Sequence, residues 1–185
     1  YIGRYVSTHL KMLKNSLLLR RSYTPLKTLG PFVYFPLHVP ADMALTLRSP
    51  QYLDQLAFID YLARSVPSTH KVAIKEHPAM IGAIDAPRLL AMLGRYNNLC
   101  LLPPSTNNYD VLRAADVIVS VNSKSGAEAL ALKKPVIVVG DAFYSKAPFV
   151  HLAKKTADIP ALLNKIIAGY KPPEDAALDL YFERV

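Results

Sequence analysis

The stretch from residue 117 to residue 130 limits the possible folds of this chain more than any other. Residues 117–121 are apolar and β-branched apart from Ser120, which is typical of a buried strand. Asn122, Ser123 and Ser125 follow, and all three are residue types that begin helices. A strand that enters a helix in this way leaves free backbone N–H groups and the positive end of a helix dipole at one point, where phosphates bind. An ordinary capped turn is the alternative interpretation.

The same order of strand and helix repeats along the chain. Runs of strand length stand at 32–39, 71–77, 99–102, 116–121 and 135–140, and helical patterns stand at 50–65, 86–94, 108–115, 125–132 and 159–168. This alternation predicts an α/β fold, with a parallel five-stranded sheet and helices on both faces.

We expect three parts along the chain. Residues 1–31 form a helical segment, with helical character over 4–20, and a linker rich in proline. Residues 32–170 form the α/β domain, and residues 171–185 form a C-terminal tail. Because the chain begins with Tyr1 rather than Met, we expect it to be a piece of a longer protein.

Composition excludes several classes of protein. No stretch reaches the roughly 18 apolar residues of a membrane span, and the single cysteine, Cys100, builds neither a disulfide framework nor a cysteine metal cluster. The chain also lacks the glycine-rich dinucleotide motif, the phosphate loop, the serine-hydrolase elbow and the zinc helix. No signal-peptide pattern is present. We therefore expect a cytoplasmic protein with no bound metal or cofactor.

The net charge of +8 is concentrated near the N-terminus, where six basic residues precede any acid. Such a segment suits nucleic acid, an anionic membrane surface or an acidic polysaccharide. No nucleic-acid-binding motif accompanies it, so we expect no nucleic-acid partner. Peripheral association with a membrane and packing on a part of the protein outside this chain both stay open.

Polar side chains follow the predicted strands, at the edge where open parallel sheets bind ligands. His77 can donate a hydrogen bond to a phosphate or act as an acid toward a departing phosphate, or it can simply cap the strand end. Ser123 and Ser125 offer further donors to the same phosphate, while Lys124 either adds charge or faces solvent. His38 has a weaker case, because its apolar neighbours favour a packed position.

Residues farther along complete the candidate site. Glu128 lies three positions after Ser125, where it either closes a capping box or binds a ribose hydroxyl. Asp141, Phe143 and Tyr144 follow the fifth strand and either wall a nucleotide or pack a loop. The predicted binding residues are His77, Asn122, Ser123, Lys124, Ser125, Gly126, Glu128, Asp141 and Tyr144.

Four segments together carry a family resemblance. Tyr-Phe-Pro-Leu-His at 34–38, Lys-Glu-His-Pro at 75–78, the stretch at 121–130 and the stretch at 135–144 occur in this order. Over roughly residues 32–163 the chain resembles the bacterial capsule polysaccharide biosynthesis family, which includes Kdo transferases. Members are glycosyltransferases of the GT-B type, with two Rossmann-like domains, of which the C-terminal one holds the nucleotide-sugar donor.

The resemblance implies that this chain is the donor-binding C-terminal half of such an enzyme. It assigns His77, as the catalytic residue, and Ser123 with Ser125 to the donor phosphate, and Glu128 to the nucleotide. It implies a CMP-linked sugar such as CMP-Kdo and a glycan or glycolipid acceptor. Peripheral association with the inner face of the inner membrane, through the basic N-terminal segment, stays open. No metal is required, because the helix dipole and the histidine stabilise the departing phosphate. The catalytic base would lie in a preceding domain.

Two other functions stay open. One is a sugar-nucleotide epimerase of the same two-domain fold. The other is a non-catalytic module that recruits capsule polymer or export machinery through the basic residues of 4–27.

Overall fold

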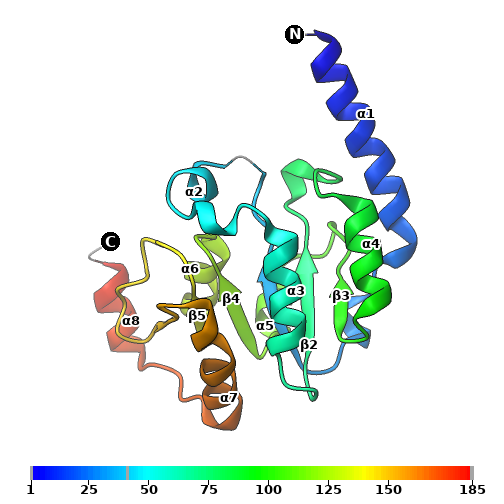
Figure 1. The fold of residues 1–185 in the computed structure, drawn as a ribbon. Helices are drawn as coiled ribbons and strands as arrows, with labels where there is room; N and C mark the ends of the chain where they lie inside the picture. The colour runs from blue at the N-terminus through cyan, green and yellow to red at the C-terminus, as the bar shows by residue number, and fades with distance from the viewer. Residues whose placement is uncertain (1, 41, 184–185) are drawn as a thin grey trace.

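A parallel sheet forms the centre of the molecule (Figure 1), which a computed structural model describes over residues 2–40 and 42–183. Six strands are hydrogen-bonded in the order β3-β2-β1-β4-β5-β6. This is the strand order of a Rossmann-like fold. Strands β1 to β3 are added toward one edge of the sheet and β4 to β6 toward the other, so the order reverses between β1 and β4. The strands are β1 (Phe32–Pro36), β2 (Lys71–Lys75), β3 (Leu99–Leu101), β4 (Val117–Ser120), β5 (Val136–Val138) and β6 (His151–Leu152).

The sixth strand is a correction to the predicted five. β6 has two residues, His151 and Leu152, which pair with Ile137 and Val138 of β5. Two residues are too few to show a strand pattern of their own, so this strand at the sheet edge is defined by its pairing with a neighbour rather than by its own side chains. The prediction of a parallel Rossmann-like α/β fold is confirmed.

Helices cover both faces of the sheet because side chains alternate along each strand. Val33 and Phe35 of β1 face one core, and Phe32 and Tyr34 face the other. The first core is covered by α3 (Gln55–Ser65), α4 (Ala86–Arg95) and α7 (Ile159–Gly169), which lie in front of the sheet in Figure 1. The second core is covered by α5 (Asn108–Ala114), α6 (Lys124–Ala131) and α8 (Asp175–Phe182).

Two regions differ from the predicted helices. The segment expected as one helix over 50–65 is divided, because the Asp54 side chain accepts from the Ala57 N–H and starts α3 anew. The predicted tail contains α8, whose Tyr181 and Phe182 pack on the second core, while its residues 184–185 lie outside the described residues. The remaining short helices are η1 (Arg20–Ser22), η2 (Leu26–Thr28), α2 (Met43–Thr46), η3 (Pro50–Tyr52), η4 (Pro78–Met80) and η5 (Thr156–Asp158).

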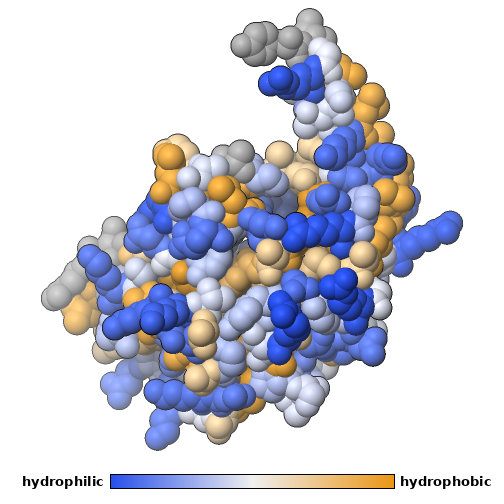
Figure 2. Space-filling view, viewed as in Figure 1, coloured by the Kyte–Doolittle hydropathy of each residue, from blue (hydrophilic) through white to orange (hydrophobic). Residues whose placement is uncertain are grey.

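The N-terminal helix α1 (Ile2–Leu19) rises from one edge of the domain (Figure 1). Its end is anchored, because Leu19 is fully buried in the first core and Thr24 N–H donates to the Leu101 carbonyl at 2.8 Å, just beyond the helix. Its outer side carries exposed apolar side chains, visible along the helix in Figure 2: Val6, Leu10, Leu13 and Leu17. None of the helices in the described residues is both long and apolar enough to cross a membrane.

Candidate functional site

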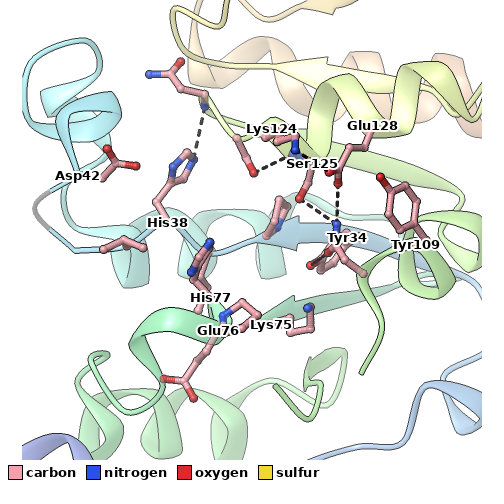
Figure 3. A pocket seen from close by; sticks show the side chains of 17 residues that line it. Tyr34, His38, Asp42, Lys75, Glu76, His77, Tyr109, Lys124, Ser125 and Glu128 are labelled. Atoms are coloured by element: carbon pink, nitrogen blue, oxygen red, sulfur yellow. Dashed lines mark hydrogen bonds and ion pairs between the residues drawn. The ribbon is translucent and has the colours of Figure 1, made fainter. Parts of the chain in front are cut away.

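A pocket of about 370 Å³ opens where β1, β2 and β4 end (Figure 3). This is the switch point of the sheet, where the connections after β1 and β4 run in opposite directions and leave a crevice. Six of the nine predicted site residues line it: His77, Asn122, Ser123, Lys124, Ser125 and Glu128. The fold therefore brings the histidine after β2 and the serine turn after β4 into one pocket.

The His77 ring is held in one orientation by a backbone N–H two residues farther along the chain. Its Nδ1 accepts a hydrogen bond from the Ala79 N–H at 3.2 Å, across the start of η4. In the neutral ring the hydrogen must then lie on Nε2. His77 thus caps a helical turn with one nitrogen and, because the side chain is exposed at the pocket, offers Nε2–H as a donor to an anion.

The serine turn after β4 has fewer free N–H groups than predicted. Ser123 N–H donates to Ser120 Oγ and Ser125 N–H to Ser123 Oγ, both at 3.2 Å, and Asn122 N–H points to His38 Nε2 at 3.4 Å. Small hydroxyl side chains satisfy the N–H groups of their own turn, so the capped-turn interpretation describes the local geometry. An anion would therefore meet mainly side-chain donors here.

Glu128 belongs to a hydrogen-bonded network on the pocket floor (Figure 3). Asn108 Nδ2 donates to Glu128 Oε2 at 3.0 Å and to Ser125 Oγ at 3.1 Å. Tyr34 donates to Asn108 Oδ1 at 3.1 Å, and burial, reinforced by Glu128, raises the pKa of Tyr34 so that it stays protonated. The helix cap is Ser123, which leaves Glu128 two residues too far along α6 to close a capping box.

Sequence reasoning did not assign Lys75 to the site, although it lines the pocket and is only 5% exposed. Its Nζ donates to the Thr106 carbonyl at 3.2 Å. Burial lowers the pKa of Lys75, and the nearby Glu128 carboxylate opposes that change. A charged residue directly after the apolar residues 72–74, at the end of the strand that carries ligand sites, was the signal that could have found it.

His38 also lies in the pocket, against the weaker case that the sequence made for it. Gln55 holds its backbone with hydrogen bonds of 2.7 Å to the N–H and 3.1 Å to the carbonyl. Burial lowers the pKa of the imidazole; nearby Asp42 opposes this shift and His77 adds to it. The neutral ring accepts from Asn122 and so joins the loop after β1 to the loop after β4.

Three predicted residues do not line the pocket. Tyr144 is fully buried beneath α6, where its hydroxyl contacts Ser120 Oγ and donates to the Ser123 carbonyl, both at 2.7 Å. Gly126 packs on that ring, since a Cβ there would overlap the Tyr144 hydroxyl. Asp141 is exposed and pairs with Arg48 at 3.1 Å. Tyr144 and Gly126 thus support the serine turn from below, because the chain after β5 turns under α6.

Glu76 predicts a pH dependence of stability. This side chain is 3% exposed; Oε1 accepts from the Gly82 N–H at 2.8 Å, and Oε2 has no hydrogen-bond partner among the described residues. Burial raises its pKa above the ordinary 4.5, and the Gly82 N–H offsets part of that rise. Because the folded state then holds a proton that the unfolded state has released, the free energy of unfolding falls as pH rises from about 4.5 through the raised pKa.

Glu76→Gln should remove this dependence and gain stability relative to the wild type over that pH range. Urea unfolding followed by circular dichroism at several pH values measures the difference. Glu174→Gln, at an exposed glutamate, is the control. Its free energy of unfolding should vary with pH as that of the wild type does. If the free energy of unfolding of Glu76→Gln also varies with pH as in the wild type, burial does not raise the pKa of Glu76.

Comparison with known proteins identifies relatives over most of the chain. Residues 16–149 match the family described as capsule polysaccharide biosynthesis protein. Protein FixF of Sinorhizobium fredii is 30% identical over 158 residues, which cover 84% of this chain and 37% of FixF. The chain thus spans little more than a third of that relative.

Solved structures share the fold at lower identity. The β-Kdo 2,7 transferase of Thermosulfurimonas dismutans KpsC matches with a TM-score of 0.56 and 22% identity, covering 81% of this chain and 47% of that one. The β-Kdo 2,4 transferase of the same KpsC matches with a TM-score of 0.52 and 17% identity, covering 93% and 54%. A Listeria monocytogenes protein assigned as a UDP-N-acetylglucosamine 2-epimerase has a TM-score of 0.50 and 14% identity, covering 83% and 40%.

These structural similarities support the fold, while membership of a family rests on the match of residues 16–149. That match extends from the end of α1 to beyond β5, over well more than half of the chain. It includes every segment that lines the pocket. This chain is a member of the capsule polysaccharide biosynthesis protein family.

Proposed function

We propose that this chain binds the nucleotide-sugar donor of a GT-B glycosyltransferase that acts in bacterial capsule assembly. The observation that carries the proposal is the shared pocket of His77 and the serine turn at the switch point of the sheet. Membership of the capsule polysaccharide biosynthesis protein family supports a role in capsule assembly. The acceptor and the catalytic base would be held by a part of the enzyme outside this chain.

The pocket supplies the groups that a departing phosphate needs. During transfer, the bond between the sugar carbon and the phosphate oxygen breaks, and negative charge grows on that oxygen. His77 Nε2–H, the hydroxyls of Ser123 and Ser125, and the buried Lys75 ammonium provide donors and positive charge there. Glu128, fixed by Asn108, would accept hydrogen bonds from the ribose hydroxyls.

A CMP-linked acidic sugar is the donor we propose. Of the two histidines that line the pocket, His38 accepts a hydrogen bond from the Asn122 N–H, which leaves His77 and the serine turn to bind an anion. One histidine and one serine turn suit the single phosphate of a CMP-sugar. Two structures that share the fold are Kdo transferases, which makes CMP-Kdo the first candidate. Transfer would be to a glycan or glycolipid acceptor.

Calorimetric titration with CMP, CDP, UMP and UDP tests the proposal. We expect selective binding of CMP, and a loss of affinity of about tenfold or more in His77→Ala, because a hydrogen bond to a charged group is lost. His9→Ala is the matched control, since His9 is exposed on α1 and does not line the pocket. The proposal would be contradicted if none of the four nucleotides bound, or if His77→Ala bound CMP as tightly as the wild type.

A sugar-nucleotide epimerase is the second candidate. The fold similarity to the Listeria monocytogenes protein favours it, because that protein is assigned as an epimerase acting on a UDP-sugar. Tighter binding of UDP than of CMP in the same titrations would support the epimerase over the glycosyltransferase.

A further inference from the structure

The inner side of α1 is fastened to the loop that follows His77. Asn15 is 5% exposed, and its Nδ2 donates to the Gly82 carbonyl at 2.9 Å and to the Ile84 carbonyl at 2.8 Å. Leu19, one turn farther along the same side of the helix, is buried in the first core. A single amide thus joins α1 to a segment 67 and 69 residues away in the sequence.

Gly82 is held on three sides. Asn15 bonds its carbonyl, and Glu76 Oε1 accepts from its N–H at 2.8 Å. Its φ of +80° is in the left-handed region, and a Cβ there would overlap the Met12 carbonyl of α1. Only glycine lets the helix backbone and this loop approach so closely.

The loop held in this way orients the His77 ring. Ala79 N–H donates to His77 Nδ1, and Met80 N–H donates to the His77 carbonyl at 2.9 Å. The next turn closes with Ala83 N–H on the Met80 carbonyl at 3.1 Å. The contacts that hold Gly82 form a clamp on this loop. Hydrogen bonds and the short stretch of backbone between them therefore connect the clamp to the Ala79 N–H, which bonds the nitrogen that sets the tautomer of the imidazole.

We propose that Asn15 is a positioning residue for His77, acting through Gly82 and the loop at 78–84. Asn15 itself does not line the pocket. Its two hydrogen bonds keep the Ala79 N–H on Nδ1, so that Nε2–H stays directed toward the anion. This role rests on the proposed function, in which His77 binds the donor phosphate.

The test compares two variants that break the clamp by different means. Asn15→Asp keeps the side-chain shape and removes both donated hydrogen bonds, whereas Gly82→Ala adds no charge and forces the loop away from Met12. Asn98→Asp is the matched control, because Asn98 Nδ2 also donates to a carbonyl, that of Ala63 at 2.8 Å, and does not line the pocket.

Three measurements are made on each protein. Hydrogen exchange at residues 78–84 should speed up about tenfold or more in both clamp variants, with exchange in β1 and β4 unchanged. Nitrogen NMR of the imidazole should show the Nε2–H form of His77 in the wild type and a tautomer mixture in the clamp variants. Affinity for CMP should fall about tenfold in both and stay unchanged in Asn98→Asp.

The outcomes separate the two proposals. If Asn15→Asp matches Asn98→Asp in loop exchange and in the His77 spectrum, the positioning role is overturned. Faster hydrogen exchange at residues 78–84 with an unchanged His77 spectrum and unchanged CMP affinity overturns it as well. If the loop and spectrum respond as expected but the wild type binds none of the four nucleotides, the clamp on His77 stands and the proposed function fails.

Discussion

Gly126→Ala is expected to lower the free energy of unfolding by about 2 to 4 kcal/mol. The added Cβ would overlap the Tyr144 hydroxyl, and the ring cannot move aside because it is fully buried. Displacing it breaks the hydrogen bonds of that hydroxyl with Ser120 and with the Ser123 carbonyl. Chemical unfolding followed by circular dichroism measures the loss.

The same substitution should also weaken nucleotide binding, because Tyr144 supports the turn that carries Ser123. Gly94→Ala is the matched control. Gly94 is an exposed glycine in α4 whose Cβ would meet no atom within 4 Å, so alanine there should stabilise the protein by about 0.5 to 1 kcal/mol. If Gly126→Ala unfolds at the same denaturant concentration as the wild type, the packing described for Tyr144 is wrong.

Asn108→Ala is expected to destabilise the protein by about 2 to 3 kcal/mol, which is the second large effect. The variant removes three hydrogen bonds and leaves the hydroxyl of Tyr34, which is 1% exposed, without the Asn108 carbonyl oxygen. It also frees Glu128 to change orientation. In titrations we therefore expect weaker CMP binding and a smaller difference in affinity between CMP and deoxy-CMP.

Two further variants show whether the network itself is responsible. Adding Tyr34→Phe to Asn108→Ala should recover part of the lost stability, because the buried hydroxyl is then removed together with its acceptor. Asn107→Ala removes only the cap on Tyr109 N–H, at a cost of about 1 kcal/mol, and should leave nucleotide binding intact. A double variant less stable than Asn108→Ala would argue against the network.

Much of the fold was predictable, for a reason visible in β1 and β4. Strands of a parallel sheet are buried on both faces, so they appear in the sequence as apolar runs at 32–36 and 117–120. β6 carried no such signal, because it exists only as the edge partner of β5. The break before α3 depended on the single capping residue Asp54, which a helical pattern of apolar residues does not reveal.

The candidate site was predictable where position after a strand decides it. His77 follows β2 and Ser123 follows β4, the two strands on either side of β1, and parallel strands present such residues at one edge. Asn108 was not predictable, since its bonds to Tyr34 and Glu128 join segments 74 and 20 residues apart. Tyr144 also follows a strand, yet the path of the chain turns it into the core.

The amino-acid sequence by itself determined the order of strands and helices, the edge of the sheet that carries polar groups, and the two segments that meet there. Local patterns of apolar side chains and helix-capping residues are enough for this, because they act over a few neighbouring positions. The tertiary structure alone decided which side chains complete the pocket and which lie beneath it. Those contacts depend on segments that approach one another only after packing, as Asn15 and Gly82 do across 67 residues.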